Sequence, residues 1–176
     1  MENADNRQIR LHVIHLGQDD PSKCTAMRLK RAGVVDFSYN ERRGILLDPF
    51  SPRALSRTDK EIVAKEGIVA VDASWKVLER DFMRIKWNNS KRRSLPLLIA
   101  ANPTNYGRPY NLSTAEALAS SLYITGYAEQ AREIMAHFKW GDTFFALNTR
   151  YLELYSMAKD SHEIISLQSK IINSKL

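Results

Sequence analysis

The segment from residue 93 to residue 126 limits the possible folds more than any other part of the chain, because it joins two confident elements through a loop dense in turn-forming residues. The apolar run 95–101 predicts a strand. After the polar loop 102–112, Ser113 with Glu116 three residues later is the signature of a capped helix, which Gly126 ends. Strand, polar loop and capped helix form an arrangement that places backbone donors around a small ligand.

The first half of the chain alternates between strand and helix signals. Apolar residues alternate with polar ones over 9–16, and short strands are expected at 34–37 and 44–47. The run 68–71 is apolar throughout, which is typical of a parallel sheet covered on both faces. Between the strands, helices are expected at 22–32, capped by Ser22, at 58–66, opened by Ser56 and Asp59, and at 75–83.

From residue 113 onward the apolar spacing is helical. Helices are expected at 113–126, around 131–138, after a cap at Asp142, and after Asp160. The predicted fold class is therefore α/β: an N-terminal parallel-sheet α/β lobe at residues 1–94 that continues into a mainly helical C-terminal lobe at residues 95–176.

Composition reduces the number of function classes that fit the chain but does not select one of them. Lys and Arg number 26 against 20 acidic residues, a net charge of +6, which favours a polyanionic partner but does not distinguish RNA from DNA or an acidic membrane. The one cysteine, Cys24, excludes an internal disulfide and a Cys-rich metal site, and it is expected to be buried and inert. His12 and His15 are staggered on a strand, so no metal site is predicted. With no signal peptide and no membrane-spanning run, a cytoplasmic protein that does not bind membranes is expected.

Four loops are expected to meet at the carboxyl end of the sheet, where parallel α/β folds bind ligands: 19–25, 47–52, 72–75 and 102–114. Asp72 is equally compatible with a helix cap and with a ligand contact. Trp75 would ordinarily be core, although its place just after a strand end is poor for deep burial. The basic segment 86–93 around Trp87 suits RNA slightly better than a solvated loop. Phosphate-loop, dinucleotide and nucleophile-elbow motifs are absent.

Seven ordered motifs nearly span the chain and resemble those of the small-subunit ribosomal RNA aminocarboxypropyltransferases. They are 20–25 (Asp-Pro-Ser-Lys-Cys-Thr), 47–52 (Leu-Asp-Pro-Phe-Ser-Pro), 72–75 (Asp-Ala-Ser-Trp), 93–103 (Arg-Ser-Leu-Pro-Leu-Leu-Ile-Ala-Ala-Asn-Pro), 105–109 (Asn-Tyr-Gly-Arg-Pro), 112–117 (Leu-Ser-Thr-Ala-Glu-Ala) and 138–141 (Phe-Lys-Trp-Gly). Ala73 departs from the Cys expected in many relatives, and a small residue there should leave the turn intact.

The resemblance implies a fold similar to the SPOUT methyltransferases, with S-adenosylmethionine held in a trefoil knot. It implies an enzyme of ribosome biogenesis that transfers the 3-amino-3-carboxypropyl group to N3 of a pseudouridine, N1-methylated or not, in small-subunit ribosomal RNA. The partner would be that RNA or a pre-ribosomal particle, and the protein would be a monomer.

The same resemblance assigns residues to roles. Leu47, Pro49 and Leu95 would line the adenine pocket, and the Val71 backbone would hold the ribose. Thr25 and Thr114 would hold the amino-acid end of the cofactor. Asp72 near the sulfonium and Trp75 over the methyl group would be catalytic. The candidate RNA contacts are Lys76, Arg92, Arg93 and Arg108.

Two other functions fit the same sequence. An RNA methyltransferase would use the same cofactor pocket but transfer the methyl group. A non-catalytic ribosome-assembly factor would need only the basic loops. The identity of the general base is left open.

Overall fold

The computed structural model describes residues 8–18, 20–38, 43–74 and 78–174. Within these residues a five-stranded sheet has the order β2-β1-β4-β3-β5. Its strands are β1 (Leu11–His15), β2 (Asp36–Phe37), β3 (Ile45–Leu47), β4 (Ile68–Asp72) and β5 (Arg92–Arg93). Every pairing between neighbouring strands is parallel, which confirms the predicted sheet type.

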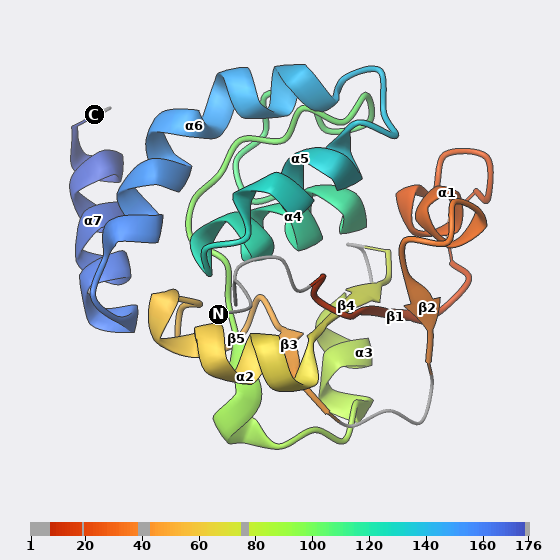
Figure 1. Cartoon of the computed structure of the whole chain (residues 1–176), viewed down its shortest axis with the longest axis horizontal. Helices are drawn as coiled ribbons and strands as arrows, with labels where there is room; N and C mark the ends of the chain where they lie inside the picture. Colours follow the sequence, from red (N-terminus) through yellow and green to blue (C-terminus); the bar gives the residue numbers. More distant parts are fainter. Residues whose placement is uncertain (1–7, 19, 39–42, 75–77, 175–176) are drawn as a thin grey trace, which may run out of the picture.

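Helices surround this sheet. The α-helices are α1 (Thr25–Arg31), α2 (Lys60–Glu66), α3 (Leu78–Arg84), α4 (Thr114–Ile124), α5 (Ala128–Met135), α6 (Gly141–Met157) and α7 (Ser161–Asn173), and short 3-10 turns are η2 (Arg57–Asp59) and η3 (Asn89–Lys91). In Figure 1, α4, α5 and α6 lie on one side of the sheet and α3 on the other. None of the described helices combines the length and the apolar character that a membrane span requires.

Both faces of the sheet are covered, as the apolar run 68–71 predicted. Alternate residues of one strand, Ile68 and Ala70, belong to the main core that α4, α5 and α6 complete. Val69 points the other way and forms a smaller cluster with Leu46 and Trp87. The main core draws on residues from both sides of position 94, and the division into two lobes stays a prediction.

The predicted strand at 95–101 is wrong, and the last strand is β5 instead. Within this segment the backbone N–H groups of Leu97, Ile99 and Ala101 donate to side chains rather than to a neighbouring strand. Their acceptors are Gln168 of α7, Asn148 of α6 and Glu116 of α4, at 2.7–2.8 Å. Because a buried N–H must find an acceptor, these helical side chains replace a sheet neighbour.

Two predicted helix starts are also corrected. The Ser22 backbone and hydroxyl donate to Asp20 Oδ1, which closes a turn, so α1 begins later with Cys24 as its N-cap. The helix α6 begins at Gly141 rather than after Asp142. The predicted starts at Ser56, Ser113 and Asp160 are confirmed, and the first two have complete capping boxes.

Candidate active site

A cleft of about 1370 Å³ opens at the carboxyl end of the parallel strands. Residues from all four loops that the sequence places at this edge line it, including Cys24, Pro49, Asp72 and Asn102. The expected convergence of the loops is therefore confirmed. The predicted cofactor residues that the structure describes all lie in the cleft wall: Thr25, Leu47, Pro49, Val71, Asp72, Leu95 and Thr114. Trp75 lies outside the described residues.

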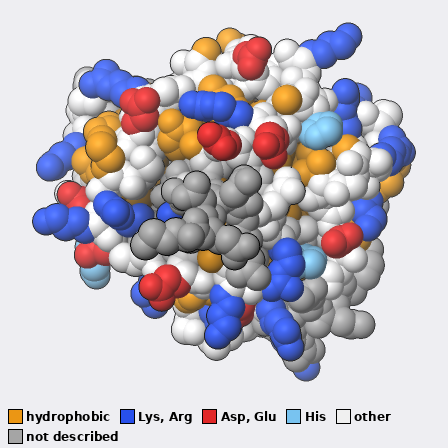
Figure 2. Space-filling view, viewed as in Figure 1, with side chains coloured by type: hydrophobic (Ala, Val, Ile, Leu, Met, Phe, Trp, Pro, Cys, Tyr) orange, Lys and Arg blue, Asp and Glu red, His pale blue; other side chains and the backbone are white. Residues whose placement is uncertain are grey.

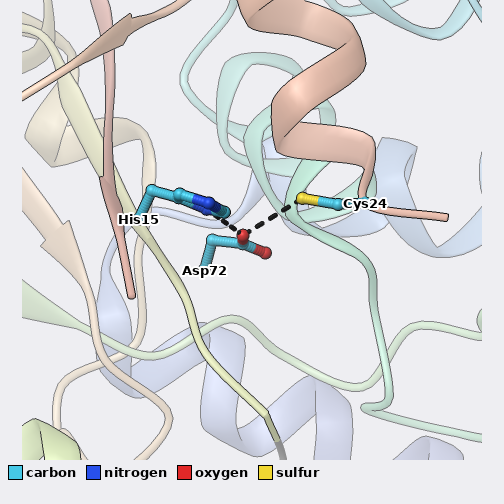
Figure 3. A group of neighbouring side chains, drawn as sticks. All are labelled: His15, Cys24 and Asp72. Atoms are coloured by element: carbon cyan, nitrogen blue, oxygen red, sulfur yellow. Dashed lines mark hydrogen bonds and ion pairs between the residues drawn. The ribbon is translucent and has the colours of Figure 1, made fainter. Parts of the chain in front are cut away.

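Asp72 is held from three sides at the end of β4. In the parallel pairing of β1 with β4 its partner is His15, so the two side chains leave the sheet together. The His15 Nδ1 atom lies 2.6 Å from Asp72 Oδ2, and the Cys24 thiol donates to the same oxygen at 3.2 Å (Figure 3). The hydroxyl of Thr114 donates to the other oxygen, Oδ1, at 3.0 Å. The carboxylate is only 11% exposed, and its orientation in the cleft is fixed.

Cys24 contributes both structure and electrostatics to this group. Its sulfur accepts from the Met27 backbone N–H as the N-cap of α1. Burial raises the pKa of the Cys24 thiol to about 11, with the Asp72 carboxylate as a smaller cause. At neutral pH the thiol therefore stays protonated and donates to Asp72.

The donor atoms of His15, Cys24 and Asp72 all lie within 4.8 Å of one another. Imidazole, thiol and carboxylate are groups that a divalent cation can also share. The absence of a metal site stays a prediction.

The start of α4 forms the next part of the wall. Ser113 caps this helix, and Glu116 accepts from the Ser113 N–H at 2.7 Å. Glu116 is fully buried and also accepts from the backbone N–H groups of Ala101 and Asn102. The Thr25 hydroxyl accepts from the Ala115 N–H at 3.2 Å, which joins the start of α1 to the start of α4. The two threonines thus stand beside Asp72 on connected helix ends.

Another part of the cleft wall is apolar. Leu47, Pro49 and Leu95 line it, and Leu47 is only 6% exposed. Asp48 lies between the first two, but its carboxylate accepts from Arg92 Nη1 at 2.8 Å and from the Phe50 N–H at 2.9 Å. The cleft wall therefore combines three apolar residues, a fixed carboxylate and two threonines.

Comparison with known proteins identifies the family. A family model described as "Ribosome biogenesis protein, C-terminal" matches residues 45–172. The 16S rRNA aminocarboxypropyltransferase of Methanosarcina mazei is 44% identical to this chain, covering 98% of the chain and 100% of the relative. That of Methanocaldococcus jannaschii is 40% identical, with coverage of 93% and 96%. The chain belongs to the 16S rRNA aminocarboxypropyltransferase family.

A solved structure supports the membership. The SAM-dependent rRNA:acp-transferase Tsr3 from Vulcanisaeta distributa superposes with a TM-score of 0.80 at 36% identity, covering 94% of this chain and 98% of that one. The mixed α/β fold with its parallel sheet is thus shared with that transferase. A second model, "Possible Fer4-like domain in RNase L inhibitor, RLI", matches residues 9–37. The sequence has one cysteine, whereas a four-iron cluster is held by four thiolates.

The residues predicted to bind RNA in this family member differ in their exposure. Arg108 is exposed on the 102–112 loop. Arg92 is part-buried and pairs with Asp48. Arg93 is only 4% exposed, and its guanidinium donates to both oxygens of Asp59 at 2.8–3.1 Å. The prediction for Arg93 is corrected, because a buried and paired guanidinium does not face RNA. Lys76 lies outside the described residues.

On the face of this aminocarboxypropyltransferase homologue that Figure 2 shows, positive charge is spread rather than gathered. On the face in Figure 2, Lys and Arg side chains are scattered, with Asp and Glu side chains between them. This distribution matches the modest net charge of +6 and gives no single RNA-binding patch on that face.

Sequence reasoning missed His15, which it treated only as a possible metal ligand. The signal was available, because His15 lies near the end of the predicted strand 9–16, Asp72 directly follows the predicted strand 68–71, and the two strands are neighbours in the sheet. Parallel strands that end together bring their last side chains together. The His15 ring is further held by Phe37, with the two ring centroids 4.8 Å apart and nearly parallel.

Proposed function

We propose that this protein transfers the 3-amino-3-carboxypropyl group of S-adenosylmethionine to N3 of a pseudouridine in small-subunit ribosomal RNA. The support is membership of the 16S rRNA aminocarboxypropyltransferase family and the likeness to a SAM-dependent rRNA:acp-transferase. The observation that carries the proposal is the Asp72 carboxylate, fixed by His15, Cys24 and Thr114 in the wall of a large cleft.

The residues of the cleft fit this cofactor. An adenine ring needs an apolar slot, which Leu47, Pro49 and Leu95 provide. We propose that the backbone of Val71, which lines the cleft near the end of β4, holds the ribose hydroxyls. We propose that Thr25 and Thr114, at the starts of two helices, hold the amino-acid end, because the partial positive charge at the start of the longer helix α4 favours a carboxylate. Asp72 ends β4, the strand next to that of Leu47, and contacts Thr114, so we propose that the positive sulfur lies beside it.

When bound, S-adenosylmethionine supplies a positively charged sulfur with three carbon neighbours, and the carbon that faces the nucleophile decides which group is transferred. The protein therefore controls the outcome by positioning. Asp72 is suited to this role, because its oxygens are oriented by donors on β1, α1 and α4 and hold negative charge at one place. Trp75 is proposed to cover the methyl group.

Asp72 has a second possible task. Attack by N3 leaves the electron pair of the broken carbon–sulfur bond on sulfur and releases the N3 proton, so an acceptor is required. The contacts of Asp72 favour the electrostatic role, because both oxygens already accept hydrogen bonds. The substitution Asp72→Asn keeps the shape and removes the charge. Loss of a charged contact predicts a cofactor affinity lower by about tenfold or more. Unchanged affinity and unchanged turnover would exclude both roles.

The decisive experiment uses S-adenosylmethionine labelled in the carboxyl carbon together with ribosomal RNA that lacks the modification. We expect label in the RNA at one pseudouridine and methylthioadenosine as the spent cofactor. S-adenosylhomocysteine with unlabelled RNA would instead indicate a methyltransferase. No cofactor binding by calorimetry would indicate an assembly factor. Running the reaction on free RNA and on pre-ribosomal particles, with and without N1-methylation, identifies the substrate.

The finer features implied by the resemblance are part of the same proposal. We propose that the chain forms a SPOUT-like trefoil knot around the cofactor site, acts as a monomer and works in the cytoplasm. A parallel sheet with its ligand cleft at the carboxyl ends of the strands is compatible with such a knot. Light scattering after size-exclusion chromatography tests the proposed monomeric state directly, and a measured mass of two chains would contradict it.

A further inference from the structure

The cleft continues past Asp72 in one direction along two helices. On α1, Thr25 lines the cleft beside Asp72, and Arg28 lines it one turn further on. On α4, Thr114 and Ala117 repeat this spacing. Residues three apart lie on the same face of a helix, and the rise per residue places Arg28 about 4.5 Å along the axis from Thr25. The cleft is therefore extended by one helical turn beyond the group that holds Asp72.

This extension ends against two aromatic rings. Phe138 and Trp140, from the corner between α5 and α6, line it. Their ring centroids lie 5.0 Å apart, and the rings are inclined by 36°. The Arg28 guanidinium lies over the Phe138 ring, with Cζ 5.4 Å from its centroid. We call Arg28, Phe138 and Trp140 the aromatic end of the cleft.

The aromatic end is rigid. The Gly141 N–H donates to the Phe138 carbonyl at 3.0 Å and closes the corner. A Cβ atom at Gly141 would lie 2.1 Å from the Met135 carbonyl oxygen, so the corner leaves no space for any other residue. Phe138 is buried at 7% exposure, whereas Trp140 is only half-buried and keeps part of its surface open. A ring fixed in place before binding is a good surface for stacking.

The size and charge of the cleft point to a second ligand there. Sites for small molecules measure about 300–1,000 Å³, and this cleft measures about 1370 Å³. Lys23, Arg28 and Arg31 all line it from α1 and the turn before α1. The same wall holds three carboxylates: Asp48 pairs with Arg92, Asp72 with His15, and Asp20 accepts from Ser22 and lies near Lys23, so Arg28 and Arg31 carry the remaining positive charge. The extension thus combines an aromatic ring with unbalanced positive charge, as in sites that bind unpaired nucleotides.

We propose that the aromatic end binds a nucleobase of the substrate RNA next to the modified base, stacked on Trp140, with Arg28 and Arg31 at its phosphate. This inference rests on the proposed function, because it takes RNA as the substrate. It also requires the RNA strand to be unpaired at this point, since a paired base does not offer its face to a protein ring.

The test compares three variants with the unchanged protein. Trp140→Leu keeps an apolar side chain and removes the ring, Trp140→Phe restores a ring, and Tyr106→Ala removes an exposed aromatic residue that does not line the cleft. The ligands are ribosomal RNA lacking the modification and, separately, S-adenosylmethionine. For Trp140→Leu we expect a Kd for RNA raised about 5- to 150-fold. Trp140→Phe and Tyr106→Ala should stay within about threefold of the unchanged protein, and all should bind the cofactor equally.

Arg28→Ala adds an independent readout. Loss of one phosphate contact should reduce the slope of log Kd against log salt concentration by about 0.7 for a single strand. An unchanged Kd for RNA in Trp140→Leu would overturn the proposal. The proposal would also be overturned if Tyr106→Ala weakened RNA binding as much as Trp140→Leu does. A rise in the cofactor Kd of Trp140→Leu that equals the rise in its RNA Kd would overturn it too, because the aromatic end would then belong to the cofactor site. The reaction of the unchanged protein tests the proposed function separately from the aromatic end. Labelled RNA and methylthioadenosine as products support the function whether or not Trp140 contributes to RNA binding.

Discussion

The Arg93–Asp59 pair gives the sharpest test of the structure, because the sequence assigned Arg93 to RNA and the fold assigns it to the interior. Arg93 and Asp59 are 4% and 3% exposed. Besides its bonds to Asp59, the Arg93 guanidinium donates to the carbonyls of Ser90 and Arg92 at 2.7 and 2.8 Å. The substitution Arg93→Met removes every one of these donors and leaves the Asp59 carboxylate buried without its partner.

Removing one partner of a buried ion pair costs about 3–5 kcal/mol of unfolding free energy. For a chain of this length each kcal/mol shifts the melting temperature by about 2–4 °C, so Arg93→Met should melt about 6–20 °C lower. Urea titration and calorimetry measure the two quantities. Adding Asp59→Asn to Arg93→Met should recover part of the loss, because the amide removes the isolated charge and still accepts from the Ser56 N–H.

Arg108→Met is the matched control, since it also removes one guanidinium but from an exposed side chain. Its unfolding free energy should change by less than about 0.5 kcal/mol, while the salt dependence of RNA binding becomes flatter. An Arg93→Met protein that melts within about 2 °C of the unchanged chain and binds RNA more weakly would refute the reasoning. Arg93 would then be an RNA contact after all.

Three further predictions concern buried groups. Because the pKa of Cys24 is raised to about 11, only about one thiol in a thousand is ionised at pH 8; alkylation should be very slow there and accelerate up to about pH 11, and fast alkylation at pH 8 would contradict the burial. Gly67 has φ +88°, and an added Cβ would lie 2.5 Å from the Arg10 carbonyl oxygen. Gly67→Ala should therefore lower the unfolding free energy, measured by urea titration, more than Gly33→Ala, where an added Cβ meets no atom within 4 Å. Equal losses of unfolding free energy would argue against the close approach at Gly67. Glu116→Gln should lower the unfolding free energy by about 1.5–3 kcal/mol in the same titration, and no change would show that the charge of this carboxylate does not matter.

The parts of the fold that could be predicted from the sequence depend on neighbours in the chain. The Ser113–Glu116 capping box needs only the three-residue spacing, and it is present as predicted. The strand β4 was visible because its apolar residues face helices on both sides. The positions of the four loops followed from the parallel order of the strands.

The errors arise where distant residues decide the local structure. The 95–101 run has strand-like composition, but its N–H groups are satisfied by Glu116, Asn148 and Gln168, which lie up to 71 positions away. Arg93 carries a charge that composition places at the surface, and only its pairing with Asp59, 34 positions earlier, explains its burial. Neither partner could be found by reading the neighbouring residues.

The way in which residues 95–101 are held has a consequence for the order in which the folded protein forms during synthesis. A wall of the cleft that is held by a neighbouring strand could form once that strand had left the ribosome. This wall is held instead by the side chains of Asn148 and Gln168, which belong to the last two helices of the chain. Because synthesis proceeds from the N-terminus, the sheet can assemble well before residue 168 emerges. The Leu95 side of the cleft is therefore completed only after residue 168 has been synthesised.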